Sequence, residues 1–295
     1  MKQLVVISGK GGTGKTVFTA SLAALSAGLN PGDNKVVMAD CDVDAADLHL
    51  LLSPDVKEKH DFKSGVTAFI DKDKCIQCGL CERLCRFDAI SKDFTVDTVS
   101  CEGCSFCANA CPEQAIEMKE NLSGQWFISE TRFGIMVHAK LGIAEENSGK
   151  LVTLVREQSK RIAEKNNSDW IIIDGSPGIG CPVIASLSGV DCAVIVTEPT
   201  LSGLHDAQRV VAVARHFNVS VIMVVNKYDL NVDVTEQIER YCQEENIAFA
   251  GKIEFNKIVV EAMVNRKTIV EYCNEDITAS IKNIWDKICH YILSK

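Results

Sequence analysis

Short apolar runs separated by helical stretches recur along most of the chain. Residues 4–7, 35–39, 170–174, 193–197 and 221–225 are rich in aliphatic side chains and predict buried parallel strands. Residues 17–27, 151–165 and 201–216 have the composition of helices. Strands that alternate with helices predict an α/β fold of three layers with a mostly parallel sheet.

This alternation stops between residues 61 and 120, which predicts an inserted module in a discontinuous domain of residues 1–60 and 121–295. After the insert, residues 126–129 and 135–138 predict two short strands. A predicted helix over residues 277–293 ends the chain. Its apolar face consists of Ile281, Ile284, Trp285, Ile288 and Ile292. The helix lacks the dense basic face of a membrane anchor, so we expect it to pack against the sheet.

Length and charge restrict the possible partners. A chain of 295 residues with 46% hydrophobic content can form a full α/β core and one smaller module. The net charge of -9 argues against nucleic acid or an anionic membrane as the main partner. The first strand leaves no room for a signal peptide, and no apolar run has the length of a membrane span. We therefore expect a soluble, cytoplasmic protein.

A glycine-rich loop lies between the first predicted strand and the first predicted helix. It matches the G-x-x-x-x-G-K-[ST] pattern of a phosphate-binding loop (P-loop) and consists of Gly9, Lys10, Gly11, Gly12, Thr13, Gly14, Lys15 and Thr16. The backbone N–H groups of such a loop and the N-terminus of the following helix bind phosphate. We expect Lys15 to contact the β- and γ-phosphates and Thr16 to bind Mg²⁺.

With a second lysine at its start, Lys10, the loop resembles the deviant P-loop of the MinD/ParA/nitrogenase-iron-protein superfamily. The resemblance covers nearly the whole chain and is strongest to MinD-like ATPases that carry an inserted ferredoxin domain. It implies a homodimer that closes over two Mg·ATP, in which Lys10 reaches the nucleotide of the partner. Lys10 and Lys15 would then both offset the charge of the phosphates.

Carboxylates follow two of the predicted strands, at the edge where open α/β sheets bind ligands. Asp174 ends an apolar strand, as in the Walker B pattern, and is expected to hold Mg²⁺. Asp40 and Asp42 follow residues 35–39 as a D-x-D pair. The resemblance implies that Asp42 orients the attacking water in the first switch and that Asp40 lies near Mg²⁺. Residues 175–180 resemble the second switch, which senses the γ-phosphate.

Eight of the 14 cysteines lie in the predicted insert, in two C-x₂-C-x₂-C-x₃-C runs that start 26 residues apart. In bacterial two-cluster ferredoxins with this spacing, the fourth Cys of each run binds the other cluster. We therefore assign one [4Fe–4S] cluster to Cys75, Cys78, Cys81 and Cys111, and the other to Cys85, Cys101, Cys104 and Cys107. Paired zinc sites are the alternative, because C-x₂-C pairs also bind zinc.

Three further positions have candidate roles. Arg86 stands where many ferredoxins have proline, which affects packing or redox potential but not cluster binding. Cys181 follows Asp174 at the distance at which the nitrogenase iron protein has the ligand of a bridging cluster. The alternative is a buried structural thiol, and no second cysteine for such a cluster stands clearly upstream. His138, alone in an apolar strand, is expected to be structural.

Asn226, Lys227 and Asp229 form an N-K-x-D sequence, which Ras-like GTPases use to bind guanine. In the MinD-like group the Asn amide instead pairs with adenine. The deviant P-loop and the D-x-D pair favour ATP, and GTP is the alternative. We expect Asn226 and Lys227 to bind the nucleotide and residues 254–256 to line the base pocket.

Together, these features predict an ATPase that couples nucleotide state to electron transfer through two [4Fe–4S] clusters. It would donate low-potential electrons to a metalloenzyme or its maturation system, so a redox or metalloprotein partner is expected. The alternative is a carrier or scaffold that hands over an iron–sulfur or other metal cofactor. A positional switch without redox work would leave the eight cysteines unexplained.

Overall fold

A computed structural model describes residues 1–28, 36–142, 147–273 and 276–294. The chain divides into two compact units. Unit 1 comprises Met1–His60, Trp126–Lys140 and Ser148–Lys295, and unit 2 comprises Asp61–Gln125 and Leu141–Asn147.

The described strands form one sheet, with the order β3-β4-β5-β2-β6-β1-β7-β8-β9. Every neighbouring pair from β5 to β9 in this order is parallel. The strands are β1 (Lys2–Ser8), β2 (Val36–Asp40), β3 (Asp55–Ile70), β4 (Ile116–Thr131), β5 (Gly134–Leu141), β6 (Trp170–Pro177), β7 (Cys192–Thr197), β8 (Ser220–Asn226) and β9 (Ala248–Ile253). The predicted α/β fold with a mostly parallel sheet is confirmed.

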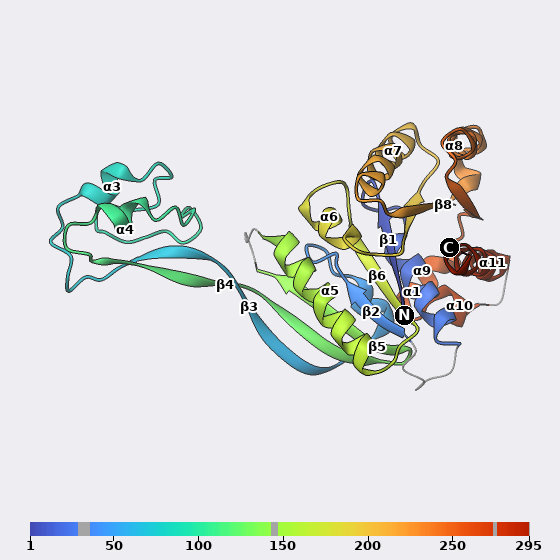
Figure 1. Cartoon of the computed structure of the whole chain (residues 1–295), viewed down its shortest axis with the longest axis horizontal. Helices are drawn as coiled ribbons and strands as arrows, with labels where there is room; N and C mark the ends of the chain where they lie inside the picture. The colour runs from blue at the N-terminus through green and yellow to red at the C-terminus, as the bar shows by residue number, and fades with distance from the viewer. Residues whose placement is uncertain (29–35, 143–146, 274–275, 295) are drawn as a thin grey trace. The chain divides into compact units, whose positions relative to one another are not determined.

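Helices cover both faces of the parallel part of the sheet (Figure 1). Helices α1 and α11 pack on one face, and α5, α6 and α7 pack on the other. In unit 1 the helices are α1 (Lys15–Ser26), α2 (Leu48–Leu52), α5 (Ser148–Lys165), α6 (Cys181–Leu187), α7 (Leu201–His216), the short 3₁₀ helix η1 (Tyr228–Leu230), α8 (Val232–Glu244), α9 (Ile258–Val264), α10 (Ile269–Tyr272) and α11 (Asp276–Leu293). Because both faces are covered, the central strands are continuously apolar and buried.

Helix α11 packs into the main core, as its periodicity predicts. All five residues of its predicted apolar face are buried in that core. The ring of Trp285 lies 5.1 Å from that of Trp170 on β6. Among the described residues, no helix is long and apolar enough to cross a membrane.

The carboxyl ends of the parallel strands bring the predicted site residues to one edge of the sheet. The P-loop follows β1, Asp40 ends β2, Asp174 lies in β6 and Asn226 ends β8. The register places Asp40 directly beside Asp174. This edge is the expected ligand site of an open α/β sheet.

Some elements differ from the predictions. The two short strands predicted at residues 126–129 and 135–138 are parts of the longer strands β4 and β5. Strands β3 and β9 and helix α6 lie outside every predicted element. Much of β3 is exposed and charged, so it has no continuous apolar run that would reveal a strand.

Unit 2 has its own small core and an internal repeat. Helices α3 (Leu80–Leu84) and α4 (Phe106–Ala110) each belong to one cysteine run. The core comprises Ala68, Ile70, Ile90 and Ile116. Positive φ angles recur at matching positions: 55° at Gln77 and 62° at Gly103, 74° at Gly79 and 62° at Ser105, and 51° at Asp88 and 49° at Gln114. The repeat seen in the cysteine spacing is therefore also a repeat of backbone conformation.

Candidate functional site

The P-loop connects β1 to α1 and is fixed by close contacts with two other segments. Helix α1 begins at Lys15, directly after Gly14, whose φ of 87° lies in the left-handed region that favours glycine. A Cβ atom at Gly14 would collide with the Asn226 amide, and one at Gly9 would collide with Asp206 on α7. Gly9 is therefore required by the packing of the loop, and Gly14 by its backbone conformation.

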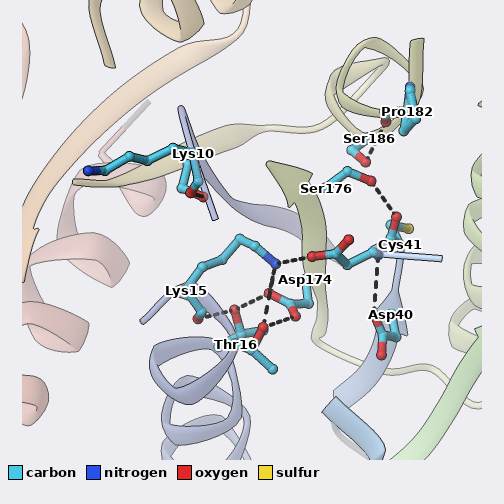
Figure 2. Close-up of polar contacts among 12 residues, drawn as sticks. Lys10, Lys15, Thr16, Asp40, Cys41, Asp174, Ser176, Pro182 and Ser186 are labelled. Atoms are coloured by element: carbon cyan, nitrogen blue, oxygen red, sulfur yellow. Dashed lines mark hydrogen bonds and ion pairs between the residues drawn. The ribbon is translucent and has the colours of Figure 1, made fainter. Parts of the chain in front are cut away.

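Lys15 and Asp174 lie in a buried polar network at the N-terminus of α1 (Figure 2). Lys15 Nζ is 3.1 Å from Asp174 Oδ1 and 3.2 Å from Asp42 Oδ2. Thr16 Oγ1 donates a 2.8 Å hydrogen bond to Asp174 Oδ2, and Thr19 Oγ1 donates one of 2.9 Å to Asp174 Oδ1. The network brings together Lys15, Asp42, Thr16 and Asp174, all predicted site residues. Its hydroxyl and carboxylate oxygens fit Mg²⁺, which prefers oxygen ligands.

The charges of the network keep Lys15 protonated. Burial alone would lower the pKa of Lys15, but Asp174 and Asp42 outweigh burial and raise that pKa above its ordinary value. For Asp42, burial raises the pKa more than the charge of Lys15 lowers it. A phosphate oxygen that replaced a carboxylate at Lys15 would keep the lysine paired and free that carboxylate for metal or water.

Asp40 lies deeper than the rest of the network. Its side chain is fully buried, and its Oδ1 accepts a 3.2 Å hydrogen bond from the backbone N–H of Asp42. Its Oδ2 has no hydrogen-bond partner within the described structure. Burial and then the charge of Asp174 raise the pKa of Asp40 well above its ordinary value. These conditions favour the neutral acid, which is a weaker metal ligand than a carboxylate.

The two predicted switch segments are joined by hydrogen bonds through Cys41 (Figure 2). The backbone N–H of Cys41 donates to the carbonyl oxygen of Asp174 over 2.8 Å. Ser176 Oγ donates a 2.7 Å hydrogen bond to the carbonyl oxygen of Cys41. The thiol itself is fully buried, and burial raises its pKa, which disfavours the reactive thiolate. A displacement of either segment would therefore strain the other.

Asn226 and Lys227 bind the backbone of the P-loop. Asn226 Nδ2 donates a 2.8 Å hydrogen bond to the carbonyl oxygen of Thr13, and Lys227 Nζ donates one of 3.0 Å to that of Gly12. Both residues line a cavity of about 580 Å³ beside the loop, a size typical of small-molecule sites. Residues 254–256, which are expected to line the base pocket, line the same cavity. The Asp229 carboxylate accepts a 2.6 Å hydrogen bond from the N–H of Phe255 and so holds this segment.

The eight cysteines of unit 2 surround two separate cavities. The thiols that line the first are Cys75, Cys78, Cys81 and Cys111. Those that line the second are Cys85, Cys101, Cys104 and Cys107. Each cavity thus combines three cysteines of one run with the fourth cysteine of the other. Among the described residues, no three Cys, His, Asp or Glu side chains converge closely enough to hold a single metal ion. Three thiols of one run with the fourth thiol of the other match the ligand pattern of a two-cluster ferredoxin, whereas a zinc site is usually closed by nearby C-x₂-C pairs.

The surroundings of these thiols also fit a cluster. Burial raises the pKa of Cys81 and of Cys107, and the charges of neighbouring cysteines raise both further. Four thiolates in one cavity would therefore need a positively charged centre. The backbone N–H of Ala115 donates a 3.4 Å hydrogen bond to Cys111 Sγ, as is common around cluster ligands.

Comparison with known families gives the identity of the fold and of the nucleotide site. The sequence matches the CobQ/CobB/MinD/ParA nucleotide binding domain over residues 4–269. The chain belongs to this family. Membership of the CobQ/CobB/MinD/ParA family supports ATP hydrolysis at the P-loop, and ATP and Mg²⁺ fit the site described above.

Three similar proteins extend this result. An uncharacterized protein of Methanocaldococcus jannaschii is 34% identical over 296 residues, which cover 98% of this chain and 97% of that protein. The septum site-determining protein MinD of Pyrococcus horikoshii, in complex with Mg-ADP, matches with a TM-score of 0.60 over 97% of this chain and 95% of that chain; at 17% identity it shows the fold alone. An uncharacterized ferredoxin of M. jannaschii is 36% identical over 61 residues, 18% of this chain and 79% of that protein. The last match fits an inserted iron–sulfur domain in this family member.

The second lysine of the family's deviant P-loop lies outside the network around Asp174. Figure 2 shows the Lys10 side chain extending away from Lys15 and Asp174. Lys10 Nζ is 2.5 Å from Glu198 Oε1. Contact with the nucleotide of a partner stays a prediction for Lys10.

Two further residues with sequence-based predictions lie elsewhere in unit 1. His138 Nε2 is 2.9 Å from Ser129 Oγ, and its ring stacks on Phe127 with centroids 5.0 Å apart. These contacts support a structural role for His138. Cys181 is exposed at the start of α6, and its Cβ lies 3.2 Å from where a Cβ at Gly149 would be. A ligand role for Cys181 stays a prediction.

Sequence reasoning missed two residues of the site. Thr19 lies one helical turn after Lys15 and therefore on the same face of α1, which could have indicated its contact with Asp174. Glu198 directly follows β7, and an acid at the carboxyl end of a parallel strand is a candidate site residue. Its contact with Lys10 joins residues 188 positions apart, and only the fold reveals it.

Proposed function

We propose that this protein binds and hydrolyses Mg·ATP and couples its nucleotide state to electron transfer through two [4Fe–4S] clusters. One observation carries the proposal: a single chain combines a P-loop whose Lys15 and Thr16 contact Asp174 in unit 1 with two four-cysteine cavities in unit 2. The ferredoxin relative and the Mg-ADP complex of the MinD structure support the two halves separately.

In this proposal, each site residue of unit 1 has a separate role in hydrolysis. Lys15 binds the β- and γ-phosphates, Thr16 and Asp174 hold Mg²⁺, and Asp42 orients the attacking water. Metal and lysine together neutralise charge that develops on the phosphates. Two chains close over two nucleotides, with Lys10 of each contributing to the other. The deviant P-loop and the D-x-D pair favour ATP over GTP.

The switch segments are the proposed origin of the coupling. Asp42 follows β2, Ser176 lies in β6, and the hydrogen bonds through Cys41 link the two segments. In the sheet order, β2 is followed by β5, β4 and β3, and the last two strands continue along the chain into unit 2. A cluster in each cavity would accept and donate single electrons, and the partner would be a redox or metalloprotein acceptor.

An anaerobic redox titration followed by EPR tests this function. Cluster potentials are measured without nucleotide, with ADP and with a non-hydrolysable ATP analogue. We expect the analogue to shift at least one potential relative to ADP. The Lys15→Ala variant is the matched control, because it keeps both cysteine runs and loses the phosphate contact. If nucleotide changes the cluster potentials of the wild type no more than those of Lys15→Ala, the coupling is refuted.

A carrier function is the second candidate, because each cavity includes one exposed thiol, Cys78 in the first and Cys104 in the second. An exposed ligand could exchange with the thiols of an acceptor protein. Challenge with an iron chelator during ATP turnover separates the two functions. A donor keeps its iron through many turnovers, whereas a carrier loses iron in proportion to the ATP hydrolysed.

A further inference from the structure

Lys10 is held by three oxygen atoms from residues 198–202, which connect β7 to the first turn of α7. Its Nζ lies 2.5 Å from Glu198 Oε1, 3.4 Å from Thr200 Oγ1 and 3.5 Å from Ser202 Oγ. Thr200 is also the N-cap of α7 and accepts a hydrogen bond from the N–H of Gly203. The segment is therefore well ordered around the lysine.

The Glu198 carboxylate binds a second lysine of the nucleotide site. Its Oε2 lies 3.4 Å from Lys227 Nζ, which also donates to the Gly12 carbonyl oxygen. The Glu198 side chain is only 19% exposed. Burial alone would raise the pKa of Glu198, but the hydrogen bond from Lys10 and the charges of Lys10 and Lys227 lower it below its ordinary value. Glu198 is thus an anion shared by two cations.

The backbone at Lys10 is fixed, so only its side chain is free to change partners. Gly9 packs tightly against Asp206 on α7. The carbonyl oxygen of Lys10 accepts a 2.8 Å hydrogen bond from Ser8 Oγ. A rotation of the Lys10 side chain would break its contacts to Glu198 and the two hydroxyls without moving the loop.

We propose that Glu198 is a positioning residue that holds Lys10 within its own chain and releases it when a second copy presents its nucleotide. This inference rests on the homodimer of the proposed function. Glu198 and a nucleotide phosphate are both anions, and Lys10 can pair closely with only one of them. The Glu198–Lys10 pair therefore opposes dimer formation, and after release Glu198 stays at the P-loop through Lys227.

An isolated surface ion pair would have little effect. The Glu198–Lys10 pair is partly buried, and the Glu198 carboxylate pairs with both Lys10 and Lys227. Two hydroxyl groups also accept hydrogen bonds from Lys10. Removal of the charge on Glu198 should therefore favour the dimer measurably.

The test compares Glu198→Gln with wild type by analytical ultracentrifugation in a titration with a non-hydrolysable ATP analogue. We expect the variant to reach half-maximal dimer at about fivefold lower analogue concentration, the size expected for release of a partly exposed ion pair. The difference should shrink between about 0.05 M and 0.5 M NaCl, because salt screens the pair. Glu245→Gln is the matched control. It also removes one charge from an ion pair, with Arg215, and should leave the titration unchanged.

The direction of the effect distinguishes this role from structural damage, which would weaken dimer formation. An analogue requirement in Glu198→Gln that equals or exceeds that of wild type overturns the proposal. Lys10→Ala separates this failure from that of the homodimer itself. If Lys10→Ala dimerises like wild type, the role of Lys10 across the interface is wrong. If Lys10→Ala blocks the dimer while Glu198→Gln behaves as wild type, the homodimer stands and the holding role of Glu198 is wrong.

Discussion

Asp40 and Asp174 lie side by side in the register of β2 and β6, but their environments differ sharply. Asp174 accepts hydrogen bonds from Thr16 and Thr19 and pairs with Lys15. Asp40 accepts only the N–H of Asp42 among its described contacts, and its second oxygen is buried without a partner. Asp174 therefore has a cation and two hydroxyls as partners, whereas burial and the charge of Asp174 raise the pKa of Asp40.

This contrast predicts that two matched substitutions change kcat to very different extents. Asp174→Asn removes a metal-binding carboxylate and should lower kcat for ATP hydrolysis by on the order of 10²-fold. Asp40→Asn keeps the shape of a side chain that accepts only the Asp42 N–H among its described contacts and whose pKa is raised by burial, and should retain kcat within about threefold. Steady-state ATPase assays with a titration of Mg²⁺ measure both effects. Equal losses in the two variants would show that Asp40 also binds the metal as a carboxylate.

Asp42 is expected to orient the attacking water and to contribute little to nucleotide binding. Asp42→Ala should lower kcat by about 10²-fold, the usual contribution of a positioned proton acceptor, while the ATP-bound dimer still forms. Single-turnover hydrolysis and sedimentation in ATP measure the two properties. Asp44→Ala, an exposed neighbour, is the control and should hydrolyse ATP normally. Normal hydrolysis by Asp42→Ala would show that the switch assignment is wrong.

The sequence was sufficient to predict the elements whose hydrophobic pattern results from burial under other layers. The strand with Leu4 to Ile7 and the helix with Ile281 to Ile292 are apolar because they are covered by other layers, and both predictions are confirmed. Strand β3 is stabilised by pairing in the sheet, and its charged, exposed positions give no such pattern. The same limit applies to the site: the P-loop is a local motif, whereas the Lys10–Glu198 contact depends on how distant segments meet.

Arg132 is expected to be a major contributor to the stability of unit 1. Its guanidinium binds the Glu271 carboxylate over 2.7 Å and 2.8 Å and donates to the carbonyl oxygens of Leu51 and Leu52. Arg132→Ala removes the cation beside Glu271, whose Oε2 keeps only its hydrogen bonds from Thr268, and removes a donor from each of the two carbonyl oxygens; it should lower the free energy of unfolding by about 3 kcal/mol. Urea denaturation monitored by tryptophan fluorescence measures this change.

Two further variants show whether this loss is specific. Arg132→Lys should recover less than half of it, because an ammonium group cannot reproduce the planar set of donors. Arg209→Ala removes a half-exposed arginine that is 4.0 Å from Asp206, and should cost less than about 0.5 kcal/mol. A loss in Arg132→Ala no larger than that in Arg209→Ala would contradict the assigned role.

His138 should make stability depend on pH in the weakly acidic range. Burial, with a smaller effect of His49, lowers the pKa of His138 to about 4 in the folded chain, against 6.5 for an ordinary histidine. Below pH 6.5 the unfolded chain takes up a proton that the folded chain excludes, so this contribution is complete above pH 6.5 and is lost as pH falls towards 4. The loss should reach about 2 kcal/mol by pH 5. His138→Gln should flatten the pH dependence of the unfolding midpoint between pH 7 and about 5. The same slope in both proteins would rule out His138 as its source.

The exchange of the fourth cysteine between the two runs can be tested with pairs of substitutions. Cys75 and Cys111 line the same cavity, whereas Cys75 and Cys85 belong to one run but line different cavities. The double variant Cys75→Ser with Cys111→Ser should therefore lose one cluster and retain about half of the iron. Cys75→Ser with Cys85→Ser removes one ligand from each cluster and should lose most of the iron. Iron and sulfide analysis with EPR of the anaerobically reduced proteins distinguishes these outcomes. If the second pair retained half of the iron and the first pair lost both clusters, each run would bind its own cluster.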